Sequence, residues 1–384
     1  MTASASQPGT SHLLSRGAVI ATAMMFGLTY SLSAALIALD LAERGFSEGL
    51  IGANAAMHAV GVLATALILP RLVAAAGVRR LIIGALVLAA VTLSSFPLVP
   101  FVWLWFPLRF LLGAASESLF VLSETWINSL STEDTRARSM AAYTAALSIG
   151  FALGPIILSV VGTSGALPYL VGAGLALVAA LFVASPKVEA PAFEKPHHSN
   201  PLHYFRLAPV AITATVLNAA IETAGLSFLA IYAVNLGWPE GDATLLISCM
   251  MIGAICLQLP IGWLGDKMDR RRLVIALAVI AAAGALVWPL ALREPIAFYA
   301  LLFVWGGAFV GIYTIMLTVV GSRFKGGDLV GIYAVMGLTW GGGALIGPLA
   351  AGVAMEFTLH GLAFFAAFAC ASFAVAALTL GKET

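Results

Sequence analysis

Four polar residues within one apolar stretch have the types and spacing to do chemistry. The stretch Arg109–Asn128 is apolar enough to lie in a lipid bilayer, yet it contains Arg109, Glu117 and Glu124 and ends at Asn128. Ionisable groups inside a membrane segment are costly, so they usually line an interior path or pair with one another. On a helix that turns about 100° per residue, Glu117 lies about 80° from Arg109, Glu124 about 60° and Asn128 about 100°. The four side chains therefore share one stripe.

The acids of this stripe are candidates for proton transfer. A cation near Glu117 favours its charged form, whereas burial favours the neutral form. A carboxylate balanced between the two can take up a proton on one side of a membrane and release it on the other. The alternative is a static Arg109–Glu117 or inter-helix pair that fixes packing. Glu124 is costly to bury, so we expect it to meet a solute, a proton or a basic group.

Other polar groups in apolar stretches extend this set. Glu222 is the only acid in the stretch 207–235 and has Asn218 one turn before it; a satisfied buried acid is the alternative. Asn54 and His58 are also one turn apart and face one surface. Histidine titrates near neutrality, which suits a proton relay, although a lone histidine near a loop is more often structural.

Aromatic residues are candidate walls of a binding cavity. Membrane aromatics also face lipid or pack in the interior, so this alternative stays open for each of them. The candidates are Tyr30, Trp305, Tyr313 and Trp340.

The composition defines the class of protein. Of 384 residues, 61% are hydrophobic and 10% are charged, and the mean hydropathy is +1.01. A soluble domain has about 25% charged residues, so this chain is expected to be a polytopic membrane protein without strands. The net charge of +1 indicates no nucleic-acid partner, and the three cysteines in apolar segments indicate no disulfide framework.

Twelve apolar stretches are long enough to cross a bilayer, which needs about 20 residues. They predict an all-α fold with two pseudo-symmetric six-helix halves, 1–184 and 207–384, joined by a polar linker, 185–206. The predicted spans are roughly 17–40, 48–70, 79–99, 101–130, 137–161, 166–184, 207–235, 242–264, 273–292, 295–321, 328–354 and 358–381.

The basic residues predict the orientation. Sixteen of the 19 Lys and Arg residues fall in one set of loops and tails, whereas the opposite loops hold only Arg44 and Arg293. Cytoplasmic loops carry the excess of positive charge. We therefore expect a multi-pass protein of the cell's inner (plasma) membrane with both termini and the linker in the cytoplasm.

The two halves repeat short patterns. Gly150-x-x-x-Gly154-Pro155 recurs 193 residues later as Gly343-x-x-x-Gly347-Pro348, and the run Arg79-Arg80-Leu81 recurs 192 residues later as Arg271-Arg272-Leu273. Two agreements at half the chain length favour duplicated halves, an arrangement found in many secondary carriers.

A family resemblance rests on the loop between the eighth and ninth spans. The run GWLGDKMDRRR, Gly262–Arg272, resembles the signature G-x-L-x-D-[RK]-x-G-R-[RK] of the major facilitator superfamily. Arg109-x-x-x-Gly113 and the two Gly-Pro elements resemble the family's fourth- and fifth-helix motifs. The runs RFLLGAASESLFVLSETWINSLS, RARSMAAY and QLPIGWLGDK are most similar to its YcaD-like branch.

The resemblance implies roles and also departs from the pattern. It implies that Arg109 influences the protonation of a nearby acid, and that Asp266 and Arg270 form a cytoplasmic gating latch. The same gating role is implied for Gly154, Pro155, Gly347 and Pro348. In the first-half copy of the loop motif, Ala74 occupies the position where the family pattern has Asp. In the second-half copy, Asp269 occupies the position before Arg270 where the family pattern has Gly. The latch is therefore expected in the second half.

These patterns together predict a secondary active transporter that moves a small organic solute by alternating access. We expect transport to be coupled to protons, with efflux slightly favoured over uptake. The acids mildly favour a cationic, zwitterionic or neutral amphipathic solute over a polyanion. No G-x-x-x-x-G-K-[ST] run occurs, which disfavours an ATP-driven pump. We expect no enzymatic activity, no cofactor or metal site, and a monomer in the lipid bilayer whose partners are the solute and protons.

Two alternatives stay open. A soft-metal importer would use Cys249, Met250 and Cys256, because thiolate and thioether ligands suit copper. A non-transporting membrane sensor is the other alternative.

Overall fold

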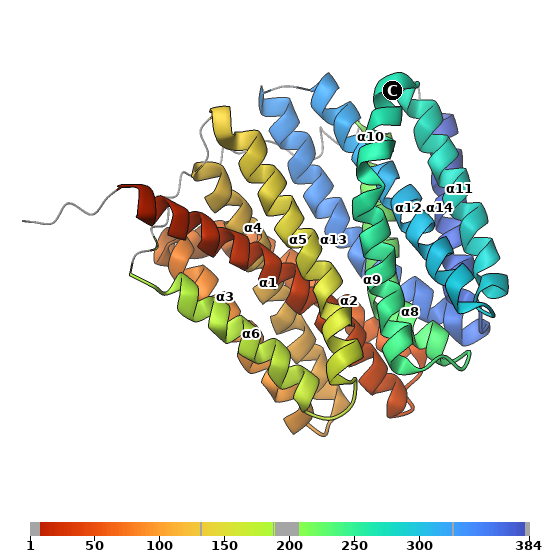
Figure 1. Cartoon of the computed structure of the whole chain (residues 1–384), viewed down its shortest axis with the longest axis horizontal. Coiled ribbons are helices and arrows are strands. Elements are labelled where there is room, and N and C mark those ends of the chain that lie inside the picture. Colours follow the sequence, from red (N-terminus) through yellow and green to blue (C-terminus); the bar gives the residue numbers. More distant parts are fainter. Residues whose placement is uncertain (1–7, 131–132, 187, 189–206, 325, 381–384) are drawn as a thin grey trace, which may run out of the picture. The chain divides into compact units, whose positions relative to one another are not determined.

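A computed structural model describes residues 8–130, 133–186, 188, 207–324 and 326–380. The described part is built from helices joined by short turns and contains no strand (Figure 1). This confirms the predicted all-α class. Most of the predicted linker, residues 187 and 189–206, lies outside the described residues.

The helices have the lengths that a membrane protein requires. The first part of the chain forms α1 (Pro8–Glu43), α2 (Glu48–Ala76), α3 (Val78–Ser95), the short 3₁₀ helices η1 (Phe96–Leu98) and η2 (Val102–Leu104), α4 (Trp105–Ser129), α5 (Glu133–Val161) and α6 (Leu167–Val183). The remainder forms α8 (Pro209–Val234), α9 (Glu240–Cys256), α10 (Gln258–Lys267), α11 (Arg270–Ala291), α12 (Pro295–Arg323), α13 (Gly326–Phe357) and α14 (Gly361–Leu380).

Eleven stretches of the described helices are long and apolar enough to cross a membrane. The twelfth predicted span is α6, an apolar helix of 17 residues. A helix of that length reaches about 25 Å, near the lower limit for crossing the hydrocarbon core. Pairing α9 with α10 as one crossing and counting α6 therefore gives the twelve predicted spans.

The eighth predicted span is divided rather than continuous. Leu257 separates α9 from α10, and Pro260 lies in the first turn of α10. Proline has no backbone N–H to donate to the carbonyl four residues earlier, here that of Cys256. This loss ends the regular ladder at the point where the sequence pattern predicted an uninterrupted helix.

The described residues group into two compact units. Unit 1 comprises 8–33, 61–130, 133–157, 164–186 and 188, and unit 2 comprises 34–60, 158–163, 207–324 and 326–380. Parts of α1, α2 and α5 therefore belong to each unit. The predicted division into sequence halves remains a prediction.

Glycines bring α1 and α5 together in unit 1. A Cβ atom on Gly27 would lie closer than 3.0 Å to the carbonyl oxygen of Leu147, and one on Gly150 would collide with the carbonyl oxygen of Met24. Gly154 meets the Ser31 hydroxyl and the Leu32 amide in the same way. Only residues without a side chain allow two helix backbones to approach this closely.

The same device joins α8 and α13 in unit 2. A Cβ atom on Gly343 would meet the carbonyl oxygen of Val216, and one on Gly347 would meet that of Ala220. Pro155 and Pro348 each follow the second glycine and lie inside a helix, in α5 and α13 respectively. Both Gly-Pro elements thus lie at close helix contacts, while their role in gating stays a prediction.

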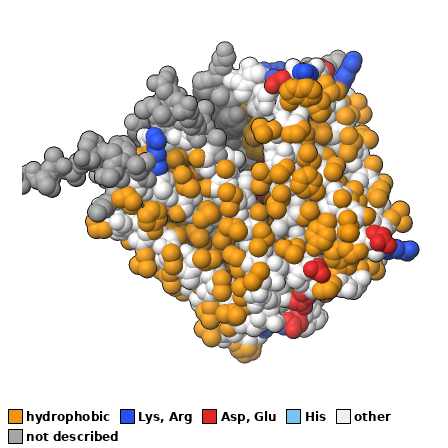
Figure 2. Space-filling view, viewed as in Figure 1, with side chains coloured by type: hydrophobic (Ala, Val, Ile, Leu, Met, Phe, Trp, Pro, Cys, Tyr) orange, Lys and Arg blue, Asp and Glu red, His pale blue; other side chains and the backbone are white. Residues whose placement is uncertain are grey.

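The surface is largely apolar. Hydrophobic side chains dominate the visible face, where charged side chains are few (Figure 2). Large apolar residues such as Leu67, Phe101, Leu181 and Phe368 are well exposed. Exposed apolar area of this extent suits a lipid environment.

Candidate functional site

The acids of the predicted stripe lie on α4 within unit 1. Glu117 and Glu124 are both half-buried, seven residues apart and therefore about 20° apart around the helix. Carboxylates on a membrane-spanning helix usually face the helix bundle or pair with other groups rather than facing lipid. Asn128 belongs to α4, but its side chain lies outside the described part of the chain.

Arg109, near the start of α4, is bound to a neighbouring helix. Its guanidinium Nη1 donates to the carbonyl oxygen of Ser33 on α1 at 3.0 Å. The residue is 3% exposed, and its Nε donates to no described residue. Arg109 makes no ion pair with Glu117 or another described carboxylate in this conformation. The direct pair that the stripe suggested is therefore not formed here.

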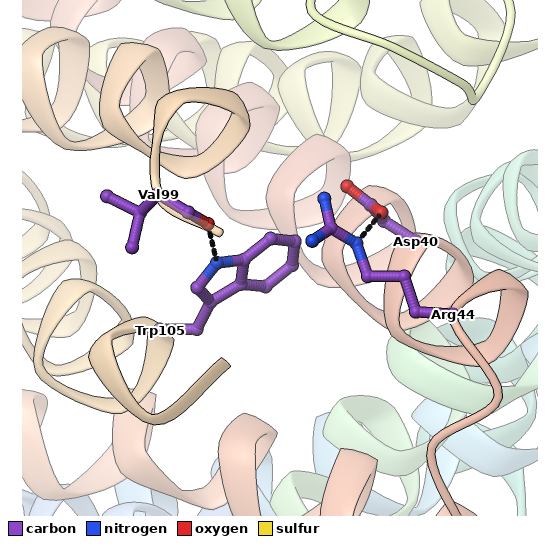
Figure 3. A network of polar contacts seen from close by, with 4 residues as sticks. All are labelled: Asp40, Arg44, Val99 and Trp105. Carbon is purple, nitrogen blue, oxygen red and sulfur yellow. Dashed lines mark hydrogen bonds and ion pairs between the residues drawn. The ribbon is translucent and has the colours of Figure 1, made fainter. Parts of the chain in front are cut away.

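Ordinary polar contacts elsewhere offer a contrast to this buried arginine. Figure 3 shows Arg44 Nε donating to Asp40 Oδ1 at 2.7 Å, an ion pair between residues one turn apart at the end of α1. The same figure shows the indole N–H of Trp105 donating to the carbonyl of Val99 at 3.0 Å. The first pair is partly exposed, so it contributes little to stability.

Four aromatic rings meet beside the acids in unit 1. The Phe26 ring lies 5.2 Å from the Phe120 ring, 5.8 Å from Phe151 and 5.9 Å from Tyr30, measured between centroids. Tyr30 lies 5.7 Å from Phe151. We call these four residues the aromatic cluster. Phe26 and Tyr30 are buried, whereas Phe120 and Phe151 are partly exposed.

The backbone carbonyl of Phe120 accepts hydrogen bonds from α5 and from α4 itself. The Tyr143 hydroxyl lies 3.2 Å from the Ser123 hydroxyl and donates to the carbonyl oxygen of Phe120 at 3.4 Å. Ser123 also donates to that carbonyl at 3.1 Å. Tyr143 therefore links α5 to the turn of α4 that lies between the two acids.

On α8, Asn218 and Glu222 are joined by a hydrogen bond. Asn218 Nδ2 donates to Glu222 Oε2 at 3.0 Å, and Asn218 Oδ1 accepts no hydrogen bond from a described residue. Asn218 is 6% exposed. A buried amide oxygen without a donor is costly and is therefore suited to receive one from a ligand.

Asn54 and His58 lie one turn apart on α2, and both are buried. Asn54 is 1% exposed, and its amide nitrogen donates to no described residue. A role in a proton relay or in solute binding remains a prediction for both.

The predicted aromatic walls have different surroundings. Trp305 is 2% exposed, donates its indole N–H to the carbonyl of Ala281 at 2.8 Å and stacks on Phe309. The hydrogen bond joins α12 to α11, whereas the stack on Phe309 lies within α12. Trp340 packs beside a small buried alanine cluster, and Tyr313 is half-buried on α12.

The loop that contains the signature run joins α10 to α11. Asp266 is exposed and makes no ion pair with a described residue, whereas Arg270 donates to the Ser322 hydroxyl at 3.1 Å. Asp269 is the N-cap of α11 and accepts the amide N–H of Arg272 at 2.9 Å. The residue that departs from the family pattern thus caps a helix, a role for which aspartate is well suited.

The cysteines give no support to a soft-metal site. The Cys249 thiol donates to the Tyr299 carbonyl at 3.2 Å, while Cys256 is exposed. Within the described ranges no group of three or more His, Cys, Asp or Glu side chains is placed to hold a metal ion.

Three residues of the aromatic cluster were not predicted from the sequence as site residues, namely Phe26, Phe120 and Phe151. Two signals pointed to them. Phe120 stands one turn from each acid of the stripe, and Phe26 stands one turn before Tyr30. Phe151 carries no such signal, because only the close contact of α5 with α1 brings it to the cluster.

Curated relatives extend over most of the chain. It is 27% identical over 365 residues to the uncharacterized MFS-type transporter YfkF of Bacillus subtilis (strain 168), covering 93% of this chain and 92% of YfkF. It is 21% identical over 315 residues to the uncharacterized MFS-type transporter YcaD of Escherichia coli (strain K12 / DH10B), covering 82% and 81%.

Solved structures share the fold. The nucleoside transporter NupG matches with a TM-score of 0.77 at 14% identity, covering 98% of this chain and 100% of that one. A D-xylose-proton symporter matches with a TM-score of 0.75 at 16% identity, covering 97% and 98%. The family model of the Major Facilitator Superfamily matches residues 18–221 and 211–384. The chain therefore belongs to the major facilitator superfamily and is a multi-pass membrane transporter.

Proposed function

We propose that this transporter couples the movement of a small organic solute to protons by alternating access, with export as the favoured direction. The observation that carries the proposal is the pair of half-buried carboxylates on one stripe of α4, Glu117 and Glu124. An acid that reaches a polar path from within a membrane helix can bind a proton there and release it again. Glu222 with Asn218 is the corresponding candidate in unit 2.

The two acids of α4 are assigned different tasks. Glu117 is the proton carrier, since it pairs with no described basic residue and so is free to change its charge. Glu124 contacts the solute. Arg109 contributes a fixed positive charge within the same helix, which is anchored on Ser33 rather than on an acid.

Export of the solute driven by inward movement of protons fits this arrangement. A proton on Glu117 and solute at Glu124 would lie on one stripe of α4, so that movement of one can be linked to movement of the other. The proposal places both termini and the linker in the cytoplasm, in keeping with the distribution of basic residues.

The test uses purified full-length protein in proteoliposomes that contain a pH-sensitive dye. Defined pools of amines, sugars, nucleosides and amino acids are added under an imposed pH gradient. We expect one pool to move protons through the wild type and not through Glu117→Gln. The exposed Glu43→Gln variant serves as a control and should behave as the wild type.

Variants of the two acids, Glu124 and Glu117, distinguish solute binding from proton coupling. Glu124→Gln should weaken the binding of the active solute by about 1.5–3 kcal/mol, the contribution of a hydrogen bond to a charged group. Glu117→Gln should keep most of the affinity, because glutamine has the same size. Solute exchange by the wild type without any proton movement would rule out the coupling.

A further inference from the structure

Phe120 of the aromatic cluster and the two acids of α4 lie on one face of the same helix and define a surface of unit 1. Phe120 follows Glu117 by three residues and precedes Glu124 by four, so that all three side chains lie within about 60° of one another around α4. Both acids are half-buried, and Phe120 is partly exposed. The ring and the carboxylates therefore face the same accessible space, which cannot be lipid because carboxylates avoid it.

The other rings extend this surface onto two further helices. Phe151 of α5 is also partly exposed, whereas the buried Phe26 and Tyr30 of α1 lie behind the two exposed rings. Phe26 touches all three partners, with centroid distances of 5.2–5.9 Å. The cluster thus packs three further rings together with Phe120, and one acid lies about one turn of α4 before Phe120 and the other about one turn after it.

We propose that this surface binds a lipophilic organic cation, a quaternary ammonium, phosphonium or protonated amine that carries apolar groups. The inference rests on the proposed function and names its substrate class. A cation over an aromatic face is attracted by the ring quadrupole, and aromatic cages are the recurrent means of binding quaternary ammonium groups. The flanking carboxylates supply the opposite charge that a desolvated cation needs.

Neutral and anionic solutes fit this surface less well. A neutral apolar solute would bind the rings but would leave a carboxylate without its water. An anion would meet two like charges, and the nearest buried cation, Arg109, is directed to the Ser33 carbonyl on α1. Arg109 also stands eight residues before Glu117, which is about 12 Å along the helix axis.

The test measures binding of tetraphenylphosphonium to the full-length protein in zwitterionic lipid nanodiscs, with empty nanodiscs subtracted. Tetraphenylborate, an anion of the same shape, is the competitor. We expect saturable binding of the cation and no competition by the anion. Equal competition by tetraphenylborate would overturn the proposal, since apolar partition alone would then explain the binding.

Matched variants locate the site. Phe120→Leu should weaken cation binding about fivefold or more, whereas Phe120→Tyr, which keeps a ring, should stay near the wild type. Phe110→Leu is the control, because Phe110 is likewise partly exposed on α4 but takes no part in the cluster. Glu124→Gln should weaken cation binding about tenfold. If Phe110→Leu and Phe120→Leu lose affinity equally, the cluster is not the site.

Transport of the same probe separates this inference from the proposed function. Cation binding that depends on Phe120, without proton-driven movement of the probe, would support the site and count against coupling. Proton-coupled transport of another solute, with no tetraphenylphosphonium binding, would overturn the substrate class and leave coupling intact. Thermal unfolding of each variant distinguishes a loss of cation binding from a loss of the folded structure.

Discussion

Tyr30 on α1 and Glu222 on α8 occupy equivalent positions in the two repeats. Gly150 packs on Met24 and Gly343 packs on Val216, and these two partners are 192 positions apart. Gly154 and Gly347 pack on Leu28 and Ala220, again 192 positions apart. The same offset relates Tyr30 to Glu222, and Phe26 to Asn218.

The equivalence has a chemical consequence. Where unit 1 places two aromatic rings, unit 2 places a carboxylate and an amide joined by a hydrogen bond. The duplicated scaffold is thus kept by the glycine contacts, while the side chains at matching positions have different chemistry.

The first prediction concerns the pair on α8. Glu222→Gln should retain thermal stability, because glutamine still accepts the hydrogen bond from Asn218 Nδ2. Asn218→Leu should lower the free energy of unfolding by about 1–3 kcal/mol, since the half-buried carboxylate of Glu222 loses its donor. Thermal unfolding in detergent measures both changes. Equal losses in the two variants would show that the volume of the site matters more than the hydrogen bond.

The second prediction concerns the close contact of α13 with α8. Gly343→Ala should destabilise unit 2, because its Cβ would collide with the Val216 carbonyl. Overpacking of this kind costs about 1–3 kcal/mol. Gly342→Ala is a matched control, since a Cβ there meets nothing within 4 Å. It should be neutral or stabilise the helix by up to about 1 kcal/mol. Indistinguishable melting temperatures would contradict the contact.

The third prediction separates the two aspartates of the signature loop. Asp269→Ala should cost about 1 kcal/mol of stability, because α11 loses its N-cap, and Asp269→Ser should restore most of it. Asp266→Asn should leave stability unchanged, because Asp266 is exposed and makes no ion pair with a described residue. If Asp266 has the predicted gating role, Asp266→Asn should also slow transport turnover while stability stays unchanged. Stability and transport rate measured on the same preparations tell the two apart.

The fourth prediction concerns a contact between the start of α2 and the end of α13 in unit 2. The Gly49 amide donates to Glu356 Oε1 at 2.9 Å, and Gly352 packs against the carbonyl of Glu48. Glu356→Ala should loosen this contact, whereas Glu356→Gln keeps an acceptor and should preserve it. Amide hydrogen exchange at Gly49 and Leu50 reports the difference. Faster exchange in Glu356→Gln than in Glu356→Ala is incompatible with this role.

The last prediction concerns orientation. In a variant whose three cysteines are replaced by alanine, Ser199→Cys should be labelled only from the cytoplasm and Gly241→Cys only from outside. The basic residues concentrated on one side are the physical reason. An impermeant thiol reagent on intact cells and on inverted vesicles makes the measurement. Labelling of Ser199→Cys in intact cells would reverse the assigned topology.

The sequence by itself determined the class of protein, the number of crossings and the family. Hydropathy and segment length are local properties, because a crossing helix satisfies its own backbone hydrogen bonds and needs only apolar side chains outside. Helical periodicity likewise placed Glu117 and Glu124 on one stripe, and Asn218 one turn from Glu222. The break between α9 and α10 escaped this reasoning, although Pro260 marks it.

Only the tertiary structure decided which neighbouring residues the polar side chains of each helix contact. Periodicity fixes the angle between Arg109 and Glu117 on α4 but not which neighbouring helix offers a better partner, and Arg109 is bound to the Ser33 carbonyl. The aromatic cluster needed the close approach of α1 and α5 at Gly27 and Gly150. Helix neighbours depend on how side chains of different segments fit together, and residues distant in sequence contain no local signal of that fit.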